Sequence, residues 1–398
     1  MKIALNGLLL CWIATASIGA EPPTIWTRHT IDDSSRGADG TRVADVNGDG
    51  LMDIATGWEQ GNVTRVYLNP GPAQSKKTWP SVTVGKTPAV EDAVFVDLNR
   101  DGATDVVTCG EGKSPGLRVH WAPDQKRYLK SKEWQTRLIP GSDQMFRWMF
   151  ATSMDVDRDG QVDIVAGGKS PKSLLGWWKV PSAAQDTDHW RWNPLRPMGW
   201  LMALEATDMD GDGDDDLLFT DRKEKRSGCF WLRNPGSVES EWQEVAVGAV
   251  GKEPMFLHRV DLDRDGLRDI VVAVRPMTIV LCRSLSSDGT KWQETEIKIP
   301  ETFGGSKGLK VADINGDGKL QIVFSTERAE QGKFGIGVCS ARGEVFSSDW
   351  SIETISGSDG IKHDLIELLD LDQDGDLDVL TCEERKNLGV IWYENPRF

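Results

Sequence analysis

The sequence is poor in the residues and motifs on which most enzymes depend. It contains only 5 histidines and 3 tyrosines in 398 residues. It has no Gly-x-Ser-x-Gly elbow, no His-Glu-x-x-His pair and no phosphate-binding glycine loop. A zinc site or a nucleophilic triad would therefore have to combine residues that lie far apart in the chain.

Long apolar runs and helical periodicity are also missing. Residues 1–20 have the pattern of a secretory signal, with Lys2 at the positive end, an apolar core from Leu8 to Ala16 and small residues up to Ala20. The core is too short for a membrane span, and Leu10 before Cys11 argues against a lipoprotein signal. We expect a secreted or periplasmic protein without membrane insertion, in which residues 21–398 form one domain.

The cysteine content and the net charge argue against a disulfide-rich protein and against a protein that binds nucleic acid or anionic membranes. Five cysteines follow the leader, an odd number in apolar runs, which favours small core residues over a disulfide framework and leaves one possible bridge open. Lys and Arg total 46 against 62 Asp and Glu, a net charge of −16. This balance argues against nucleic acid or an anionic membrane as a partner.

One acidic loop recurs seven times and divides the chain into similar units. The first copy reads Asp-x-Asn-x-Asp-Gly-x-x-Asp from Asp45 to Asp53 and runs into an apolar segment. The others begin at Asp97, Asp155, Asp208, Asp261, Asp313 and Asp370. We number the units repeats 1 to 7, and the positions of each loop from one to nine. A period of about 50 residues is typical of propellers and repeat arrays.

A tryptophan recurs at a similar spacing and opens a short alternating segment. The seven are Trp26, Trp79, Trp134, Trp190, Trp242, Trp292 and Trp350. Each repeat also has an apolar segment before its loop and two after it, with the branched residues that favour strands. Four short strands per repeat predict an all-β fold, a seven-bladed β-propeller of four-stranded blades.

The two ends of the chain predict how the ring closes. Trp26 to Ile31 has no unit before it, and the last unit lacks its tryptophan strand. The N-terminal strand should complete the last blade, which removes the open edges of a linear array. The predicted blades are 41–84, 93–139, 147–195, 200–247, 256–297, 308–355, and 363–395 with 24–31.

Acidic loops of this form between the first two strands of a blade resemble the FG-GAP and VCBS-type repeats of exported bacterial proteins and of the integrin α-chain propeller. The seven copies extend the resemblance over nearly all of residues 21–398. It implies a calcium-binding propeller, which we expect to be monomeric. It leaves activity open, because the family includes adhesion modules, receptor domains and a few polysaccharide-degrading enzymes.

The loops are predicted to hold calcium as a structural ion, in six or seven sites. Positions one, three, five and nine offer side-chain oxygens, position seven offers a carbonyl or carboxylate, and glycine at position six allows the sharp turn. In the sequence, Gln321 replaces the ninth-position aspartate of repeat 6, which predicts a weak or empty site there. The predicted ligands are Asp45, Asn47, Asp49, Leu51 and Asp53; Asp97, Asn99, Asp101, Ala103 and Asp105; Asp155, Asp157, Asp159, Gln161 and Asp163; Asp208, Asp210, Asp212, Asp214 and Asp216; Asp261, Asp263, Asp265, Leu267 and Asp269; Asp313, Asn315 and Asp317; and Asp370, Asp372, Asp374, Asp376 and Asp378.

A ligand, either a glycan or a protein, is expected on the face opposite the acidic loops and at the central channel, the usual ligand site of a propeller. The predicted ligand-binding residues are Arg42, Trp58, Arg147, Trp148, Trp200, His258, Lys310, Lys362 and His363. Tryptophan beside charged groups suits carbohydrate, because sugar rings stack on indole faces. The alternative interpretation is that these aromatics pack between blades.

Ionisable residues also recur three positions before the loops, where they would face the channel. They are Arg42, Glu205, His258, Lys310 and Glu367. They predict either ion pairs between blades or a polar pocket. In the second case His258 or His363 would act as a base and Arg42, Arg147 or Lys310 would neutralise an acidic sugar, as in a polysaccharide lyase. The favoured function is a binding module, and the lyase is the alternative.

Overall fold

The structure is a computed structural model that describes residues 25–237 and 240–396. Within these residues the regular elements are 26 β-strands and four 3-10 turns, η1 (Gln125–Arg127), η2 (Ser131–Glu133), η3 (Ser142–Gln144) and η4 (Thr187–His189). The fold is therefore all-β, as predicted. The predicted secretory signal lies outside the described residues. In the part of the chain that is described, no helix is long and apolar enough to span a membrane.

Every pair of neighbouring strands is antiparallel, and four repeats each form a four-stranded sheet. These sheets are β2 (Ala38–Ala44), β3 (Asp53–Trp58), β4 (Val63–Tyr67) and β5 (Ser81–Lys86); β6 (Val90–Val96), β7 (Asp105–Gly110), β8 (Gly116–Trp121) and β9 (Gln135–Leu138); β16 (Glu253–Val260), β17 (Asp269–Arg275), β18 (Thr278–Ser284) and β19 (Trp292–Lys298); and β20 (Gly305–Ala312), β21 (Gln321–Glu327), β22 (Ile336–Ala341) and β23 (Trp350–Thr354).

Repeats 3 and 4 share one six-stranded sheet. Its strands are β10 (Arg147–Met154), β11 (Asp163–Lys179), β12 (Arg191–Thr207), β13 (Asp216–Asp221), β14 (Gly228–Arg233) and β15 (Gln243–Gly248). The first half of β11 pairs with β10, and its second half pairs with the first half of β12. The second half of β12 pairs with β13. Two long strands thus each supply two of the segments that the sequence predicts.

The two ends of the chain meet in the sheet of repeat 7. This sheet has the order β1-β26-β25-β24 and consists of β1 (Thr27–Asp32), β24 (His363–Leu369), β25 (Asp378–Glu383) and β26 (Gly389–Glu394). Thr27 lies opposite Glu394 in the register of the pair. The N-terminal strand therefore supplies the strand that repeat 7 lacks in the sequence.

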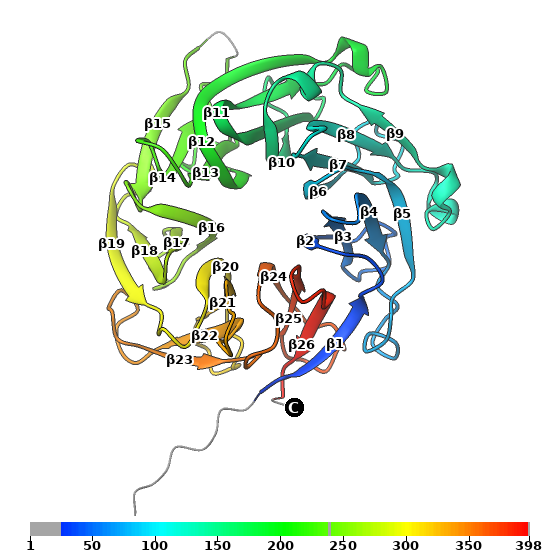
Figure 1. Ribbon diagram of the computed structural model, residues 1–398. Helices are drawn as coiled ribbons and strands as arrows, with labels where there is room; N and C mark the ends of the chain where they lie inside the picture. Colours follow the sequence, from blue (N-terminus) through cyan, green and yellow to red (C-terminus); the bar gives the residue numbers. More distant parts are fainter. Residues whose placement is uncertain (1–24, 238–239, 397–398) are drawn as a thin grey trace, which may run out of the picture.

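The sheets stand around a common centre, with the first strand of each repeat innermost (Figure 1). These strands are β2, β6, β10, β12, β16, β20 and β24. Each contacts the first strand of the next repeat, and β24 contacts β2. Since the first strand runs into an acidic loop and the second runs out of it, the loops lie at one end of these strands. The other end meets at the centre of the opposite face.

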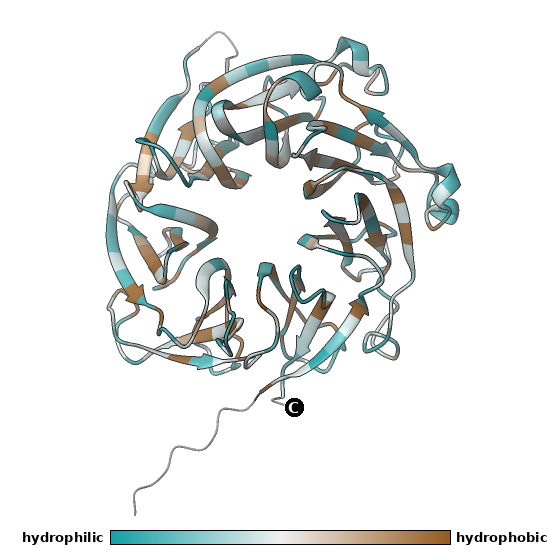
Figure 2. Cartoon of the chain, in the orientation of Figure 1, coloured by the Kyte–Doolittle hydropathy of each residue, from teal (hydrophilic) through white to brown (hydrophobic). Residues whose placement is uncertain are grey.

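Hydrophobic and hydrophilic residues both occur along the strands (Figure 2), and buried hydrophobic side chains of neighbouring sheets pack into shared clusters. The largest fully buried side chains are Trp58, Trp148, Trp231 and Trp392. The five cysteines of the described chain are all buried and unpaired. They therefore serve as small core residues, as the sequence suggested.

Every first strand carries a β-bulge close to the centre. The pairing shifts between Trp148 and Phe150 in β10 and between Leu201 and Ala203 in β12, and the other five first strands shift at the equivalent place. A bulge adds one residue to a strand and re-aims the side chains beside it. In this fold it turns a residue of each first strand toward the centre.

Candidate functional site

In six of the seven repeats, an aspartate at the ninth position links the acidic loop to its sheet through two backbone hydrogen bonds. Asp53 accepts the N–H of Val46 at 3.0 Å through Oδ2 and the N–H of Asn69 at 2.8 Å through Oδ1. The aspartates Asp105, Asp163, Asp216, Asp269 and Asp378 make the same two backbone bonds in their repeats. These carboxylates therefore tie the start of the loop to the end of the third strand.

The loops fit a divalent cation in two respects. Carboxylate oxygens of Asp155, Asp157 and Asp163 lie within 4.8 Å of one another, and the same is true of two further loop groups, in repeats 4 and 5. In addition, buried oxygens of Asp97, Asp155, Asp261 and Asp372 have no hydrogen-bond partner among the described residues. Crowded carboxylates with unused lone pairs are a donor set that suits Ca²⁺.

Burial raises the pKa of the ninth-position aspartates, although their backbone hydrogen bonds oppose this change. The pKa rises to about 6 for Asp53, Asp216 and Asp269 and to about 7 for Asp105, Asp163 and Asp378. The neighbouring loop carboxylates add to the rise. Ionising these groups in the metal-free loop is therefore costly, and a bound cation would relieve that cost.

The residue at the third loop position is either an aspartate that pairs with a Lys or Arg or an asparagine. Where this position is aspartate, a cation pairs with it. The pairs are Lys179 with Asp157, Arg233 with Asp210, Arg283 with Asp263, and Lys76 with Asp372. In repeats 1 and 2 the position is asparagine, whose amide instead donates to the fifth-position aspartate at 3.0 and 2.9 Å. An extra negative charge at position three is thus accompanied by a positive one.

A cavity of about 320 Å³ lies at the centre, at the end of the strands away from the loops. Its lining contains seven acidic side chains, seven basic side chains and six apolar or aromatic ones. Two positions of every repeat contribute to it. We call these two sets the outer ring and the inner ring.

The outer ring lies six residues after the ninth loop position, where the second strand ends or, in repeat 3, bends. Its members in chain order are Glu59, Glu111, Lys169, Arg222, Arg275, Glu327 and Glu384. Repeats 3, 4 and 5 thus contribute three consecutive cations, the basic arc. Repeats 6, 7, 1 and 2 contribute four consecutive carboxylates, the acidic arc. All seven are ionisable, and the two signs are separated around the centre.

The inner ring lies six residues before the first loop position, at or beside the bulge of the first strand. Its members are Asp39, Glu91, Met149, Met202, Met255, Lys307 and Asp364. Methionines lie in the three repeats of the basic arc, where Phe150 and Phe256 also line the cavity. Charged residues lie in the four repeats of the acidic arc. In one half of the cavity the inner ring is apolar and the outer ring is basic. In the other half the inner ring is charged and the outer ring is acidic.

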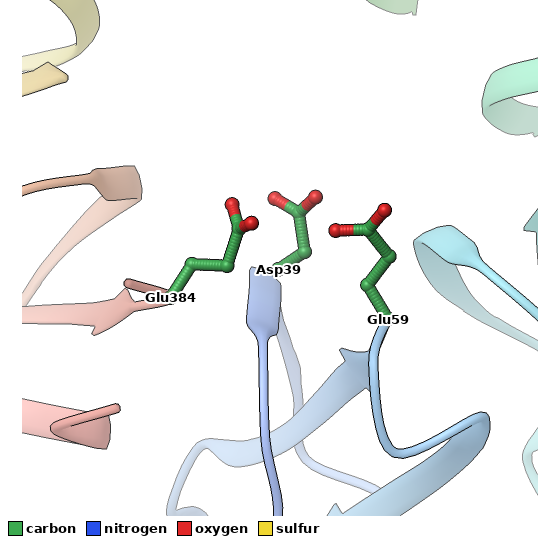
Figure 3. A group of neighbouring side chains, drawn as sticks. All are labelled: Asp39, Glu59 and Glu384. Carbon is green, nitrogen blue, oxygen red and sulfur yellow. The ribbon is translucent and has the colours of Figure 1, made fainter. Parts of the chain in front are cut away.

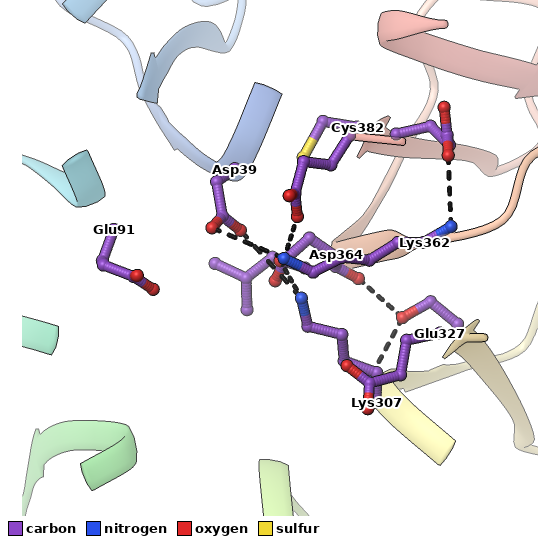
Figure 4. A network of polar contacts seen from close by, with 12 residues as sticks. Asp39, Glu91, Lys307, Glu327, Lys362, Asp364 and Cys382 are labelled. Carbon is purple, nitrogen blue, oxygen red and sulfur yellow. Dashed lines mark hydrogen bonds and ion pairs between the residues drawn. The ribbon is translucent and has the colours of Figure 1, made fainter. Parts of the chain in front are cut away.

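Ion pairs connect residues of the inner ring to one another and to Lys362. Asp364 pairs with Lys307, and Asp39 lies 4.0 Å from Lys307 Nζ and 3.9 Å from Lys362 Nζ (Figure 4). Burial raises the pKa of Asp39 well above its usual range, and the charge of Asp364 adds to this. The two carboxyl groups of Asp39 and Asp364 are thus held together by the buried Lys307 and the partly buried Lys362.

Carboxylates of three elements converge on the acidic side of the cavity. Oxygens of Asp39, Glu59 and Glu384 lie within 4.8 Å of one another, and their side chains project into the same space (Figure 3). Oxygens of Glu59, Glu91 and Glu111 form a second such group. Burial raises the pKa of Glu91 to about 8 in spite of the charge of Lys169. This side of the cavity therefore favours a cation.

Of the predicted aromatic ligand residues, only Trp200 lines the cavity. Cations lie over its ring: Lys169 Nζ and the Arg222 guanidinium carbon are each 4.5 Å from the ring centroid. Trp58 and Trp148 are fully buried, and each donates its indole N–H to the protein, to Tyr67 and to the Ser142 carbonyl respectively. Both pack in the core, which is the alternative that the sequence left open.

The predicted ionisable ligand residues are divided between the cavity and its surroundings. Lys362 lines the cavity, whereas Arg147 is exposed outside the lining. His258 accepts the Val311 N–H at 2.9 Å, and burial lowers its pKa to about 4. His363 is fully buried beside Tyr393, and burial likewise lowers its pKa to about 4. Neither histidine is part of the cavity lining.

Three of the residues three positions before the loops, Arg42, Lys310 and Glu367, form ion pairs between first strands. Lys310 Nζ lies 3.1 Å from Glu367 across β20 and β24, and Arg42 Nε lies 2.9 Å from Asp92 across β2 and β6. Neither Arg42 nor Lys310 lines the cavity. No member of the outer or inner ring is among the sequence-based candidates; Trp58 is only the neighbour of Glu59. The outer ring could have been found from the sequence, because every copy of its position is Glu, Lys or Arg.

Comparison with known proteins identifies the repeat. The model of the FG-GAP-like repeat matches residues 45–108, 208–272 and 261–324, and each match begins at the first position of an acidic loop. The chain therefore contains FG-GAP-like repeats. No curated protein matches the chain significantly.

Similarity to solved structures supports the fold. A chain in the crystal structure of BBS1N in complex with ARL6DN, soaked with mercury, matches with a TM-score of 0.54 and 11% identity over 94% of this chain and 98% of that chain. The same complex soaked with lead gives a TM-score of 0.53 and 9% identity over the same shares. At this identity the likeness concerns the fold alone.

Proposed function

We propose that this protein is an exported, calcium-stabilised β-propeller of seven blades that binds an extracellular ligand, a glycan or a protein, in its central cavity. The observation that carries the proposal is the convergence of all seven repeats on one cavity lined by seven acidic and seven basic side chains. Charged groups gathered at the centre of a fold are costly to desolvate, and a bound partner can compensate for that cost.

The seven-bladed, closed arrangement is supported by three observations. The loop occurs seven times, the first strands contact one another in a cycle, and β1 pairs with β26. Division of β11 between Lys169 and Ser173, and of β12 between Trp200 and Leu201, where its partner changes from β11 to β13, gives each repeat four strands of its own. Removal of residues 25–32 should leave the edge of β26 unpaired and lower the melting temperature. A truncated chain as stable as the full one would contradict closure.

Calcium in the loops would act on stability, because it would fix the turn that joins the first two strands of a blade. The unpartnered carboxylate oxygens of Asp97, Asp155 and Asp261 support this assignment. Export rests on the leader pattern of residues 1–20. Fractionation of cells that express the full chain, compared with a chain without residues 1–20, tests it.

The lyase alternative draws no support from the cavity. Its proposed bases, His258 and His363, lie outside the lining, and each is engaged with the protein. The three tyrosines, Tyr67, Tyr128 and Tyr393, are buried. We therefore propose binding without turnover.

Binding is tested with acidic, neutral and amino-containing soluble glycans and with peptides, by calorimetry in calcium-containing buffer. Arg222→Gln, in the cavity, should weaken the binding of at least one of these probes. Arg137→Gln is the matched control, because Arg137 is exposed on the outermost strand β9. Equal binding by both variants would place the ligand site elsewhere. Release of unsaturated sugar products would revive the lyase.

A further inference from the structure

The charge of the cavity differs from that of the chain as a whole. The chain carries a net charge of −16, yet the seven acids and seven bases of the lining balance. A pocket for a simple anion or a simple cation would carry an excess of the opposite sign. The repeats of the basic arc contribute three bases and no acid, whereas the repeats of the acidic arc contribute seven acids and four bases, Lys307, Arg328, Lys362 and Arg385. The lining is therefore balanced in formal charge but polar across its width.

The two borders between the arcs are already satisfied by the protein. At one border Lys169 Nζ pairs with Glu111 at 2.5 Å. At the other border Arg275 pairs with Glu327. The four residues that adjoin the opposite sign are therefore neutralised in place and are not the groups that a ligand would meet first.

The middle residue of the basic arc, Arg222, and one of the two middle residues of the acidic arc, Glu59, are not satisfied in this way, whereas the other, Glu384, pairs with Lys362. Arg222 is only 7% exposed, its Nε makes no hydrogen bond, and its ion pair with Glu253 is long, 3.6 Å from Nε. Glu59 has no side-chain hydrogen bond or ion pair within the described residues, and its nearest grouped neighbours are other carboxylates. Arg222 is a buried charge with an unused donor, and Glu59 is a half-buried carboxylate beside other carboxylates. A complementary ligand group can offset the desolvation of the first and the repulsion at the second.

These two groups lie on opposite sides of the centre. Glu59 follows β3 in repeat 1 and Arg222 follows β13 in repeat 4, and β3 and β13 stand on different sides of the ring of sheets (Figure 1). A cation beside Glu59 would also meet Asp39 and Glu384 (Figure 3). An anion beside Arg222 would meet a planar guanidinium that can bind a carboxylate through two N–H groups.

We propose that the cavity binds a zwitterionic ligand of small-molecule size, with its anionic group at Arg222, its cationic group at Glu59, and its apolar part on the methionines of the basic arc. This inference rests on the proposed function, since it names the ligand class of the same cavity. The volume of about 320 Å³ lies at the lower end of small-molecule sites. A free amino acid, a short peptide with both ends free, and a sugar with an amine and a carboxylate share this chemistry.

Calorimetry with probes that differ by one charge tests the inference. Leucine carries both charges and an apolar side chain, N-acetyl-leucine keeps only the anion, and leucinamide keeps only the cation. The sugar source is probed with a glucuronate–glucosamine disaccharide that has a free amine, and with its N-acetylated form. The zwitterion of one source should bind about tenfold or more tightly than its single-charge analogues, because each lost contact is a charged hydrogen bond.

Two cavity variants assign the charges to their walls. Arg222→Gln and Glu59→Gln should each weaken the zwitterion about tenfold. Glu59→Gln should leave N-acetyl-leucine unchanged, and Arg222→Gln should leave leucinamide unchanged. The controls are Arg137→Gln and Glu353→Gln on the outermost strands β9 and β23, which should bind as the wild type does.

Three results would overturn the inference while the proposed function stands. One is that N-acetyl-leucine binds as tightly as leucine and responds only to Arg222→Gln. Another is that an anion binds only when magnesium is added, so that a metal supplies the positive charge. The third is that no zwitterion binds at millimolar concentration, whereas another probe is lost in Arg222→Gln. Binding that no cavity variant alters would overturn both proposals.

Discussion

Gln321 Oε1 accepts the backbone N–H of Ile314 at 3.0 Å, in the place where the other six loops use an aspartate carboxylate. The same oxygen accepts the N–H of Asn315 at 3.3 Å. The second bond of the aspartates, to the end of the third strand, has no counterpart at Gln321 among the described residues, since both hydrogen bonds of its side chain go to the start of the loop. Gln321 thus keeps the loop start in place without a negative charge.

Gln321→Asp should convert this loop into a complete calcium site. In calcium the variant should bind one more ion per chain than the wild type and melt at a higher temperature. In a chelator it should melt at a lower temperature, because the new carboxylate is buried beside Asp313 and Asp317 without a cation. Calcium stoichiometry and melting curves in both conditions check this. An unchanged stoichiometry would mean that the loop cannot hold the ion even with a full ligand set.

Removal of calcium from the wild type should lower the melting temperature by several degrees or more, and calcium should restore it. Six loops carry the full ligand set, and binding to the folded state stabilises it by about 2.7 kcal/mol per site at a hundredfold excess over the dissociation constant. Differential scanning calorimetry in a chelator, then in excess calcium, measures the effect. Coincident melting curves would show that the loops are turns without a structural ion.

Lys179→Gln should increase the calcium affinity of repeat 3 and decrease the stability of the metal-free protein. Lys179 pairs with Asp157 and, at 3.0 Å, with Asp159, so it competes with the ion for the same carboxylates. The free energy of unfolding of the metal-free protein should fall by at most about 1 kcal/mol, because the side chain of Lys179 is 42% exposed. Calcium titration and melting curves report the two effects separately.

Lys298→Gln is the control for Lys179→Gln. Lys298 is 74% exposed and pairs with Glu296 of the same strand, away from every acidic loop. It should leave calcium affinity unchanged. If the two variants change calcium affinity alike, the lysine that pairs with the third-position aspartate acts through the net charge of the protein and not through its contact with the loop.

The sequence was sufficient for the sheets because their signals are local and repeated. Each acidic loop ends where a strand begins, as at Asp53 and Asp105, and each tryptophan lies at or just before the outer strand. The fusion of repeats 3 and 4 was not predictable. β11 and β12 continue through segments that the sequence marks as breaks, because β11 pairs with β12 on both sides of the register shift between Lys169 and Ser173.

The cavity was less predictable, and the reason is the bulge. Strand alternation places residues three and six positions before a loop on opposite faces. The bulge adds one residue between them, so that Asp39 joins Arg42 on the central side of β2. Bulges depend on the packing of seven strands around one centre and leave no clear mark in a single repeat. Burial of Trp58 and Trp148 likewise depends on neighbouring sheets.

Glu91→Gln should stabilise the protein at alkaline pH and leave it unchanged in acid. Burial raises the pKa of Glu91 to about 8, above the value of 4.5 for an exposed glutamate. Because the folded pKa is the higher one, the stability contributed by the proton is present below about pH 4.5 and is lost as the pH rises through about 8. Glutamine cannot ionise and avoids that loss. Lys169 keeps Glu111 as its partner at 2.5 Å.

The difference in melting temperature between Glu91→Gln and the wild type should therefore grow from about pH 5 to about pH 9. A one-unit difference in pKa corresponds to about 1.4 kcal/mol, so the variant should gain at least this much, a shift of a few degrees. Glu353→Gln, on the exposed edge of β23, should show a constant difference over the same range. A constant difference for Glu91→Gln as well would show that Glu91 is ionised in the folded protein at neutral pH. In that case the acidic side of the cavity would hold one more negative charge, which would strengthen its preference for a cation.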